Sequence, residues 1–118
     1  MEETPADGQI AIDVESGEEC TVISVGGQIT ELEADALSQR IDQLFEGGCY
    51  KLVFDLSEVT FMSSTGLGQI MRAYRIAKEN DGYIRVAGVQ PLVADVFRVT
   101  KLDKLVGMYD TVEEACEG

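Results

Sequence analysis

The sequence predicts an α/β domain with a mixed, mostly parallel sheet and the element order ββαβαβαβα. Apolar residues alternate in early segments, recur at helical spacing later, and form one nearly continuous run between two helical stretches. Strands that are separated by helices imply right-handed crossovers and parallel pairing. The 118 residues are enough for one domain, which we place at residues 9–118 after a flexible N-terminal segment, residues 1–8.

Two strands are predicted first. The apolar residues of segment 9–14 fall on one face, which is typical of a half-buried strand, and we expect it at or near a sheet edge. Residues 21–25 are mostly β-branched and predict a second strand, paired with the first and ending at Gly26-Gly27.

A helix and a central strand follow. Thr30 and Glu33 have the spacing of a capping box, and apolar residues then recur at helical spacing until Gly47-Gly48. Residues 50–56 are nearly all apolar, as expected of a strand that is covered on both faces.

The second half of the chain predicts a longer helix and four shorter elements. The helix runs from Gly66 to a stop at residues 80–82. The shorter elements are a strand at residues 83–87, a helix that begins at Pro91, a strand at residues 105–109 and a tail helix at residues 112–116.

Composition excludes several functions. Nine Lys and Arg against 22 Asp and Glu give a net charge of −13, which disfavours nucleic acid and anionic membranes as partners. The chain contains no His, so imidazole bases, Ser-His-Asp triads and His-ligated metals are excluded. No apolar run is long enough to cross a bilayer and no leader is recognisable, so we expect a cytoplasmic, non-enzymatic monomer without metal or cofactor.

The three cysteines, Cys20, Cys49 and Cys116, are far apart and lack CxxC spacing. They therefore indicate neither a disulfide framework nor a zinc site, and they agree with a reducing compartment.

The segment most suited to chemistry is residues 61–68, Phe-Met-Ser-Ser-Thr-Gly-Leu-Gly, between a predicted strand and the helix that follows. Three consecutive hydroxyls lie where a helix N-terminus favours an anion such as phosphate. The alternative is structural: one hydroxyl caps the helix, and the glycines permit a tight turn.

Residues 55–68, Asp-Leu-Ser-Glu-Val-Thr-Phe-Met-Ser-Ser-Thr-Gly-Leu-Gly, resemble the signature of STAS-domain anti-sigma factor antagonists. Residues 25–29 also resemble the end of that family's second strand, and the element order covers the whole chain as one STAS domain. In such proteins the hydroxyl residue two before the first Gly of Gly-Leu-Gly is phosphorylated, which implies Ser64 here. Family members commonly have Asp directly before it, whereas this chain has Ser63.

The resemblance implies an anti-sigma factor, often itself a serine-protein kinase, as the partner of the unphosphorylated form. Binding releases a sigma factor, phosphorylation ends binding, and a serine phosphatase could restore the active form. The partner-binding residues expected on this basis are Met62, Ser63, Ser64, Thr65, Gly66, Leu67 and Gly68.

Other functions stay open at this point. A non-phosphorylated STAS scaffold subunit of a signalling or lipid-transport assembly shares the same fold. A weak nucleotide-binding module is a second alternative, although Met71 replaces the third Gly of a GxGxxG pattern. Asp55 invites an aspartyl-phosphate interpretation, but the acidic metal-binding pair of a receiver domain is missing from the first strand.

Overall fold

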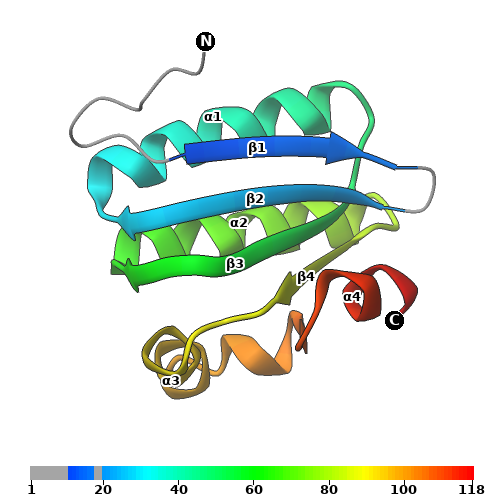
Figure 1. Cartoon of the computed structure of the whole chain (residues 1–118). Coiled ribbons are helices and arrows are strands. Elements are labelled where there is room, and N and C mark those ends of the chain that lie inside the picture. The colour runs from blue at the N-terminus through cyan, green and yellow to red at the C-terminus, as the bar shows by residue number, and fades with distance from the viewer. Residues whose placement is uncertain (1–10, 18–19) are drawn as a thin grey trace, which may run out of the picture.

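A five-stranded sheet runs through the molecule and positions its helices (Figure 1). The computed structural model describes residues 11–17 and 20–118. The strands, in spatial order, are β1 (Ala11–Ser16), β2 (Thr21–Ile29), β3 (Lys51–Met62), β4 (Tyr83–Ala87) and β5 (Gly107–Tyr109). β1 is antiparallel to β2, and the other neighbours are parallel. The predicted mixed sheet is confirmed, and β1 lies at its edge as expected.

Helices cover the two faces of the sheet unequally. The helices are α1 (Glu31–Glu46), α2 (Ser64–Glu79), α3 (Pro91–Val99) and α4 (Val112–Glu117), with a short 3-10 helix, η1 (Leu102–Lys104), between α3 and β5. In Figure 1, α1 and α2 lie behind the sheet, α4 lies in front of it, and α3 lies below β3. The element order agrees with the prediction, and the last strand is shorter because residues 105 and 106 form a turn after η1.

The apolar residues divide into two clusters, one on each face. The larger one lies under α1 and α2 and includes Phe54, Ile41 and Ile70, which are fully buried. The smaller one lies under α4 and is built around Val53 and Ala115. Because Val53 and Phe54 are adjacent in β3, their side chains point to opposite faces, and the predicted double coverage of this strand is confirmed.

Arg72 in α2 forms hydrogen bonds with α1. Its guanidinium donates to Asp42 Oδ1 and to Ser38 Oγ, each at 2.9 Å, and both acceptors are on α1. The two helices are therefore held side by side by polar contacts as well as by apolar packing.

Two strands extend beyond their predicted ends. β2 continues through Gly26-Gly27 to Ile29, because register shifts against β3 accommodate both glycines, and Gly27 has a φ of 93°. β3 continues from its predicted end at residue 56 to Met62. Together these extensions carry the sheet up to the N-terminus of α2.

The prediction of no disulfide is wrong. Cys20, directly before β2, is bonded to Cys116 in α4, and only Cys49 has a free thiol. The two partners are 96 positions apart in sequence, and only the return of α4 across the sheet brings them together.

Within the described part of the chain, none of the helices is long and apolar enough to span a membrane. The expected flexible segment 1–8, and the start of the strand expected at residues 9–14, lie outside the described residues.

Candidate partner-binding site at the start of α2

The site lies at the carboxyl ends of β2 and β3, where α2 begins. Ile29 and Met62 are partners at the end of the parallel β2–β3 pair, and the amide of Ser63 donates to the carbonyl of Ile29 at 2.8 Å. The chain then turns directly into α2 at Ser64. The extended sheet therefore fixes the position of the helix N-terminus relative to β2.

The three hydroxyl residues have different surroundings. Ser63 is the N-cap of α2, and its Oγ accepts a hydrogen bond from the amide of Gly66 at 3.2 Å. Ser64 and Thr65 are exposed in the first turn, and within the described residues neither hydroxyl has a hydrogen-bond partner. Capping is therefore done by Ser63 and leaves the hydroxyl of Ser64 free.

The predicted start of α2 and the role assigned to two of its flanking residues need correction. The helix begins at Ser64 and not at Gly66, because Ser63 provides the cap. Met62 and Leu67 are only 4% and 8% exposed and belong to the main core. They shape the site from beneath and do not form a partner-facing surface.

The two glycines of the Gly-Leu-Gly motif also differ. A Cβ on Gly66 would lie 2.9 Å from Ile29 Cγ2 and 3.0 Å from Met62 Cγ, so this glycine permits close contact between α2 and the sheet. A Cβ on Gly68 would have no heavy atom within 4 Å. Gly68 is exposed, and its missing side chain leaves the backbone of α2 open to a partner.

Two exposed apolar side chains near the site were not predicted. Phe61, next to Met62 at the end of β3, is 49% exposed, and Leu32, in the first turn of α1, is 61% exposed. Strand alternation could have indicated Phe61, because its neighbour Met62 points into the core. Both side chains therefore lie at the strand ends from which α1 and α2 begin.

The first turn of α2 contains no acidic residue, whereas that of α1 contains Glu31 and Glu33. The predicted capping box of α1 is confirmed: Glu33 Oε1 accepts from the backbone amide of Thr30 at 3.0 Å and also from its hydroxyl. The hydrogen bond from the Thr30 side chain holds the pKa of Glu33 below its ordinary value. A carboxylate thus already accepts hydrogen bonds at the N-terminus of α1, whereas the first turn of α2 has no carboxylate.

Asp55 is part of β3, and its Oδ1 accepts a hydrogen bond from the amide of Ser57 at 3.1 Å. Among residues 11–17 and 20–118, no group of three or more His, Cys, Asp or Glu side chains is arranged to hold a metal ion. The carboxylate of Asp55 therefore has a local structural partner.

The fold and this strand-to-helix junction define a class of regulatory α/β domains. The chain belongs to the STAS domain family, whose sequence profile matches residues 11–115. The resemblance noted in residues 55–68 is confirmed by this match.

Two named proteins are similar to this chain over most of its length. The chain is similar to the anti-sigma-B factor antagonist of Bacillus subtilis, with 26% identity over 97 residues, 82% of this chain and 88% of the relative. It is also similar to a crystal structure of an anti-sigma factor antagonist from Mycobacterium paratuberculosis, with 31% identity, 97% coverage of both chains and a TM-score of 0.85.

The fold is also shared with the Bacillus cell fate determinant SpoIIAA, solved in two forms. The unphosphorylated form matches with a TM-score of 0.73 at 22% identity, covering 88% of this chain and 92% of that one. The phosphorylated form matches with a TM-score of 0.74 at 23% identity, covering 91% and 97%. This fold is therefore compatible with a phosphorylated and an unphosphorylated state of the same protein.

Proposed function

We propose that this domain is an anti-sigma factor antagonist that binds an anti-sigma factor when Ser64 is unphosphorylated and releases it when Ser64 carries a phosphate. The observation that carries the proposal is the hydroxyl of Ser64, which is exposed in the first turn of α2 and has no hydrogen-bond partner among the described residues. The named relatives support the partner class, since they are antagonists of anti-sigma factors.

The fold tolerates a phosphate at this position for a physical reason. Phosphorylation adds a charge of about −1.5 to −2, and a helix N-terminus stabilises negative charge. The first turn of α2 has no carboxylate that would repel it. The modified domain is therefore expected to keep its structure.

The same phosphate would disrupt a partner interface. A partner carboxylate about 4 Å away would be repelled by roughly 4 kcal/mol per unit charge at an effective dielectric constant of about 20. Because about 1.4 kcal/mol corresponds to a tenfold change in affinity, even half of that repulsion weakens binding about thirtyfold. One modified side chain is thus sufficient to end a micromolar complex.

The contact surface follows from exposure around Ser64. It comprises the exposed residues of the α2 first turn, Thr65 and Gly68, together with the apolar side chains of Phe61 and Leu32. Ser63 and Gly66 contribute through the helix backbone that they cap and pack.

The domain needs no catalytic group of its own in this scheme. A partner serine kinase transfers the γ-phosphoryl group of ATP to Ser64 Oγ, the hydroxyl proton is released, and a serine phosphatase reverses the modification. Ser63 occupies the position at which relatives commonly have Asp, so an acidic neighbour for the acceptor is absent here.

The test is the covalent state of the protein after incubation with ATP and an extract of its own organism. Wild type should gain one phosphate by intact mass, and Ser64→Ala should gain none. Ser63→Ala is the matched control and should still be modified, because the capping hydroxyl is not the acceptor. Equal phosphate gain in wild type and Ser64→Ala would overturn the assignment of Ser64 and move the acceptor to Ser63, Thr65 or elsewhere. No gain in either protein would also overturn it and would favour a scaffold.

A further inference from the structure

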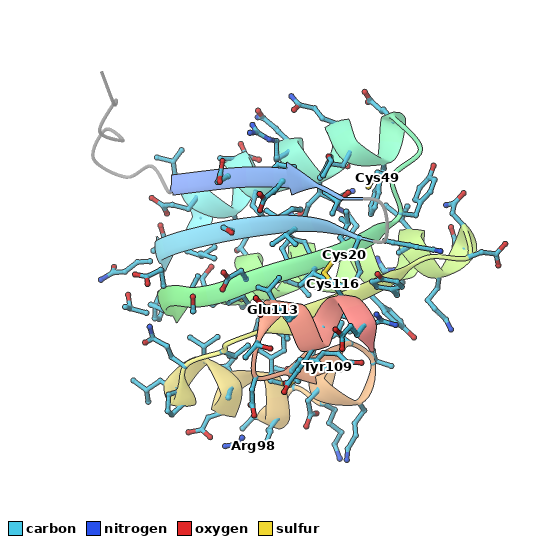
Figure 2. The ribbon with its side chains drawn as sticks, turned by 45° about the vertical axis from the view of Figure 1, so that its right-hand side comes forward. Cys20, Cys49, Arg98, Tyr109, Glu113 and Cys116 are labelled. Atoms are coloured by element: carbon cyan, nitrogen blue, oxygen red, sulfur yellow. A yellow bond between two sulfur atoms is a disulfide. The ribbon has the colours of Figure 1, made fainter. Side chains whose placement is uncertain are left out.

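We propose that Cys20 and Cys116 form a redox-dependent latch that holds α4 on the sheet face opposite α1 and α2. Figure 2 shows α4 lying across that face, with the disulfide between it and the start of β2. This inference does not rest on the proposed function.

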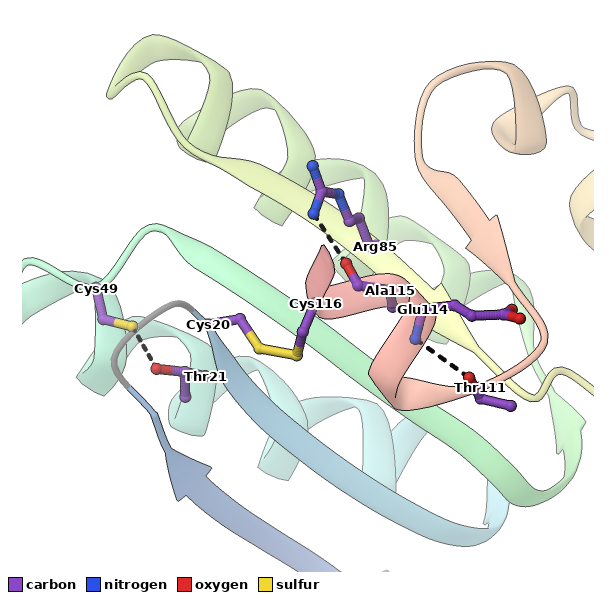
Figure 3. Close-up of a disulfide and its surroundings, with 8 residues drawn as sticks. All are labelled: Cys20, Thr21, Cys49, Arg85, Thr111, Glu114, Ala115 and Cys116. Atoms are coloured by element: carbon purple, nitrogen blue, oxygen red, sulfur yellow. Dashed lines mark hydrogen bonds between the residues drawn. A yellow bond between two sulfur atoms is a disulfide. The ribbon is translucent and has the colours of Figure 1, made fainter. Parts of the chain in front are cut away.

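The contacts of α4 show why a latch matters there. The helix has six residues, and a helix of that length is not stable without tertiary contacts. Its buried residue is Ala115, which packs in the small cluster with Val53 and Ala87. Arg85 Nη1 also donates to the carbonyl of Ala115 at 2.8 Å (Figure 3). Beside these contacts, the disulfide is the covalent link between α4 and the sheet.

The remaining domain does not depend on the bond. The main apolar cluster lies on the opposite face under α1 and α2, and a domain of 118 residues buries enough surface to fold without covalent links. Opening the latch would uncover the apolar side chains of Val53 and Ala87 while the sheet persists. Such a local opening distinguishes a switch from a structural staple.

A small thiol has a route to the bond. Cys20 and Cys49 are among the residues that line an open hollow of about 240 Å³ at the start of β2 and β3, together with Gly17, Lys51 and Asp81. Cys116 is half-buried at the end of α4. Exchange can therefore begin in the folded protein.

Cys49 lines the same hollow as Cys20, but its side chain makes a different contact. Its sulfur is 3.0 Å from Thr21 Oγ1, whereas the sulfur of Cys20 is bonded to that of Cys116 (Figure 3). Cys49 packs against the large cluster, whereas Cys20 belongs to the small one. The variant Cys49→Ser therefore tests whether the free thiol takes part in the exchange.

A small disulfide compound can act as the oxidant that forms the Cys20–Cys116 bond. The two thiols of Cys20 and Cys116 transfer two electrons and two protons to a compound such as glutathione disulfide, which becomes two thiols. Opening is the reverse, through a mixed disulfide with one of the two cysteines.

The test equilibrates the folded wild-type chain in mixtures of reduced and oxidised glutathione and follows it by non-reducing peptide mapping. The Cys20–Cys116 link should form and open reversibly without unfolding, and Cys49→Ser should respond like wild type. Because the bond closes a loop of 96 residues, oxidation should raise Tm by about 10 to 20 °C.

Amide hydrogen exchange during the first minutes shows whether the disulfide controls the local opening of α4. Amides of α4 should exchange at least about tenfold faster in the reduced form, and amides of α2 should not change on this timescale. Cys116→Ser should behave like reduced wild type under both conditions. Equal α4 exchange in both forms, a link that involves Cys49, or a bond reducible only after unfolding would each overturn the latch.

Discussion

Two helices begin at neighbouring strand ends, and their N-termini are satisfied in different ways. At α1, the carboxylate of Glu33 accepts hydrogen bonds from the backbone amide and hydroxyl of Thr30, and the first turn is acidic. At α2, the neutral hydroxyl of Ser63 caps the helix, and no acidic residue follows in the first turn. The comparison teaches that a helix end can be capped for stability and still remain able to receive a negative charge from outside.

Among substitutions at these two helix N-termini, the largest expected effect on stability concerns the packing of α2 on the strand ends. Gly66→Ala should destabilise the protein by about 1 to 3 kcal/mol, because its methyl group would overlap Ile29 Cγ2 and Met62 Cγ. Urea unfolding followed by circular dichroism measures this change.

Gly68→Ala is the matched control two residues further along α2. Since its methyl group would meet no atom within 4 Å, it should stabilise the protein by about 0.5 to 1 kcal/mol through helix propensity. Equal losses in both variants would mean that close contact with the sheet is not what requires Gly66.

The next largest effect is a difference in stability between variants of the two neighbouring serines. Ser63→Ala should cost about 1 kcal/mol, because it removes the acceptor for the amide of Gly66. Ser64→Ala should stay within about 0.5 kcal/mol of wild type, because its hydroxyl is exposed and unbonded in the described structure. Urea unfolding of both variants measures this difference in stability. A larger loss of stability in Ser64→Ala than in Ser63→Ala would reverse the assignment of cap and acceptor.

The smallest effect is a pH dependence at α1. Since the folded pKa of Glu33 lies below its ordinary value of 4.5, its contribution is complete at neutral pH and is lost as pH falls through the lowered pKa. Glu33→Gln should therefore lose less stability than wild type between pH 7 and about pH 3.5.

Urea midpoints of both proteins at the two pH values measure this difference. Parallel pH profiles for wild type and Glu33→Gln would show that the capping carboxylate is not preferentially stabilised in the folded state.

Sequence patterns predicted the order of elements because each depends on local periodicity and on local stop signals. They placed the end of β2 too early, since Gly26-Gly27 is typical of a turn and only pairing with β3 shows that both glycines remain in the strand. Bulges of this kind depend on the partner strand, which one segment does not reveal.

The sequence predicts a candidate site in residues 61–68 but does not resolve its detail. Three consecutive hydroxyls do not indicate which one caps the helix, because the choice depends on where β3 ends, at Met62. The contact between Cys20 and Cys116 was also out of reach, because it forms only when α4 folds back over the sheet.

The central claim is that Ser64 can carry a phosphate without loss of structure and that the phosphate prevents partner binding. The most direct measurement compares Kd values of the unmodified and Ser64-phosphorylated protein for the anti-sigma factor of the same organism, with circular dichroism of both forms. We expect at least about thirtyfold weaker binding by the phosphorylated form with an unchanged spectrum. Equal Kd values, or a phosphorylated protein that has lost its helical signal, would contradict the account.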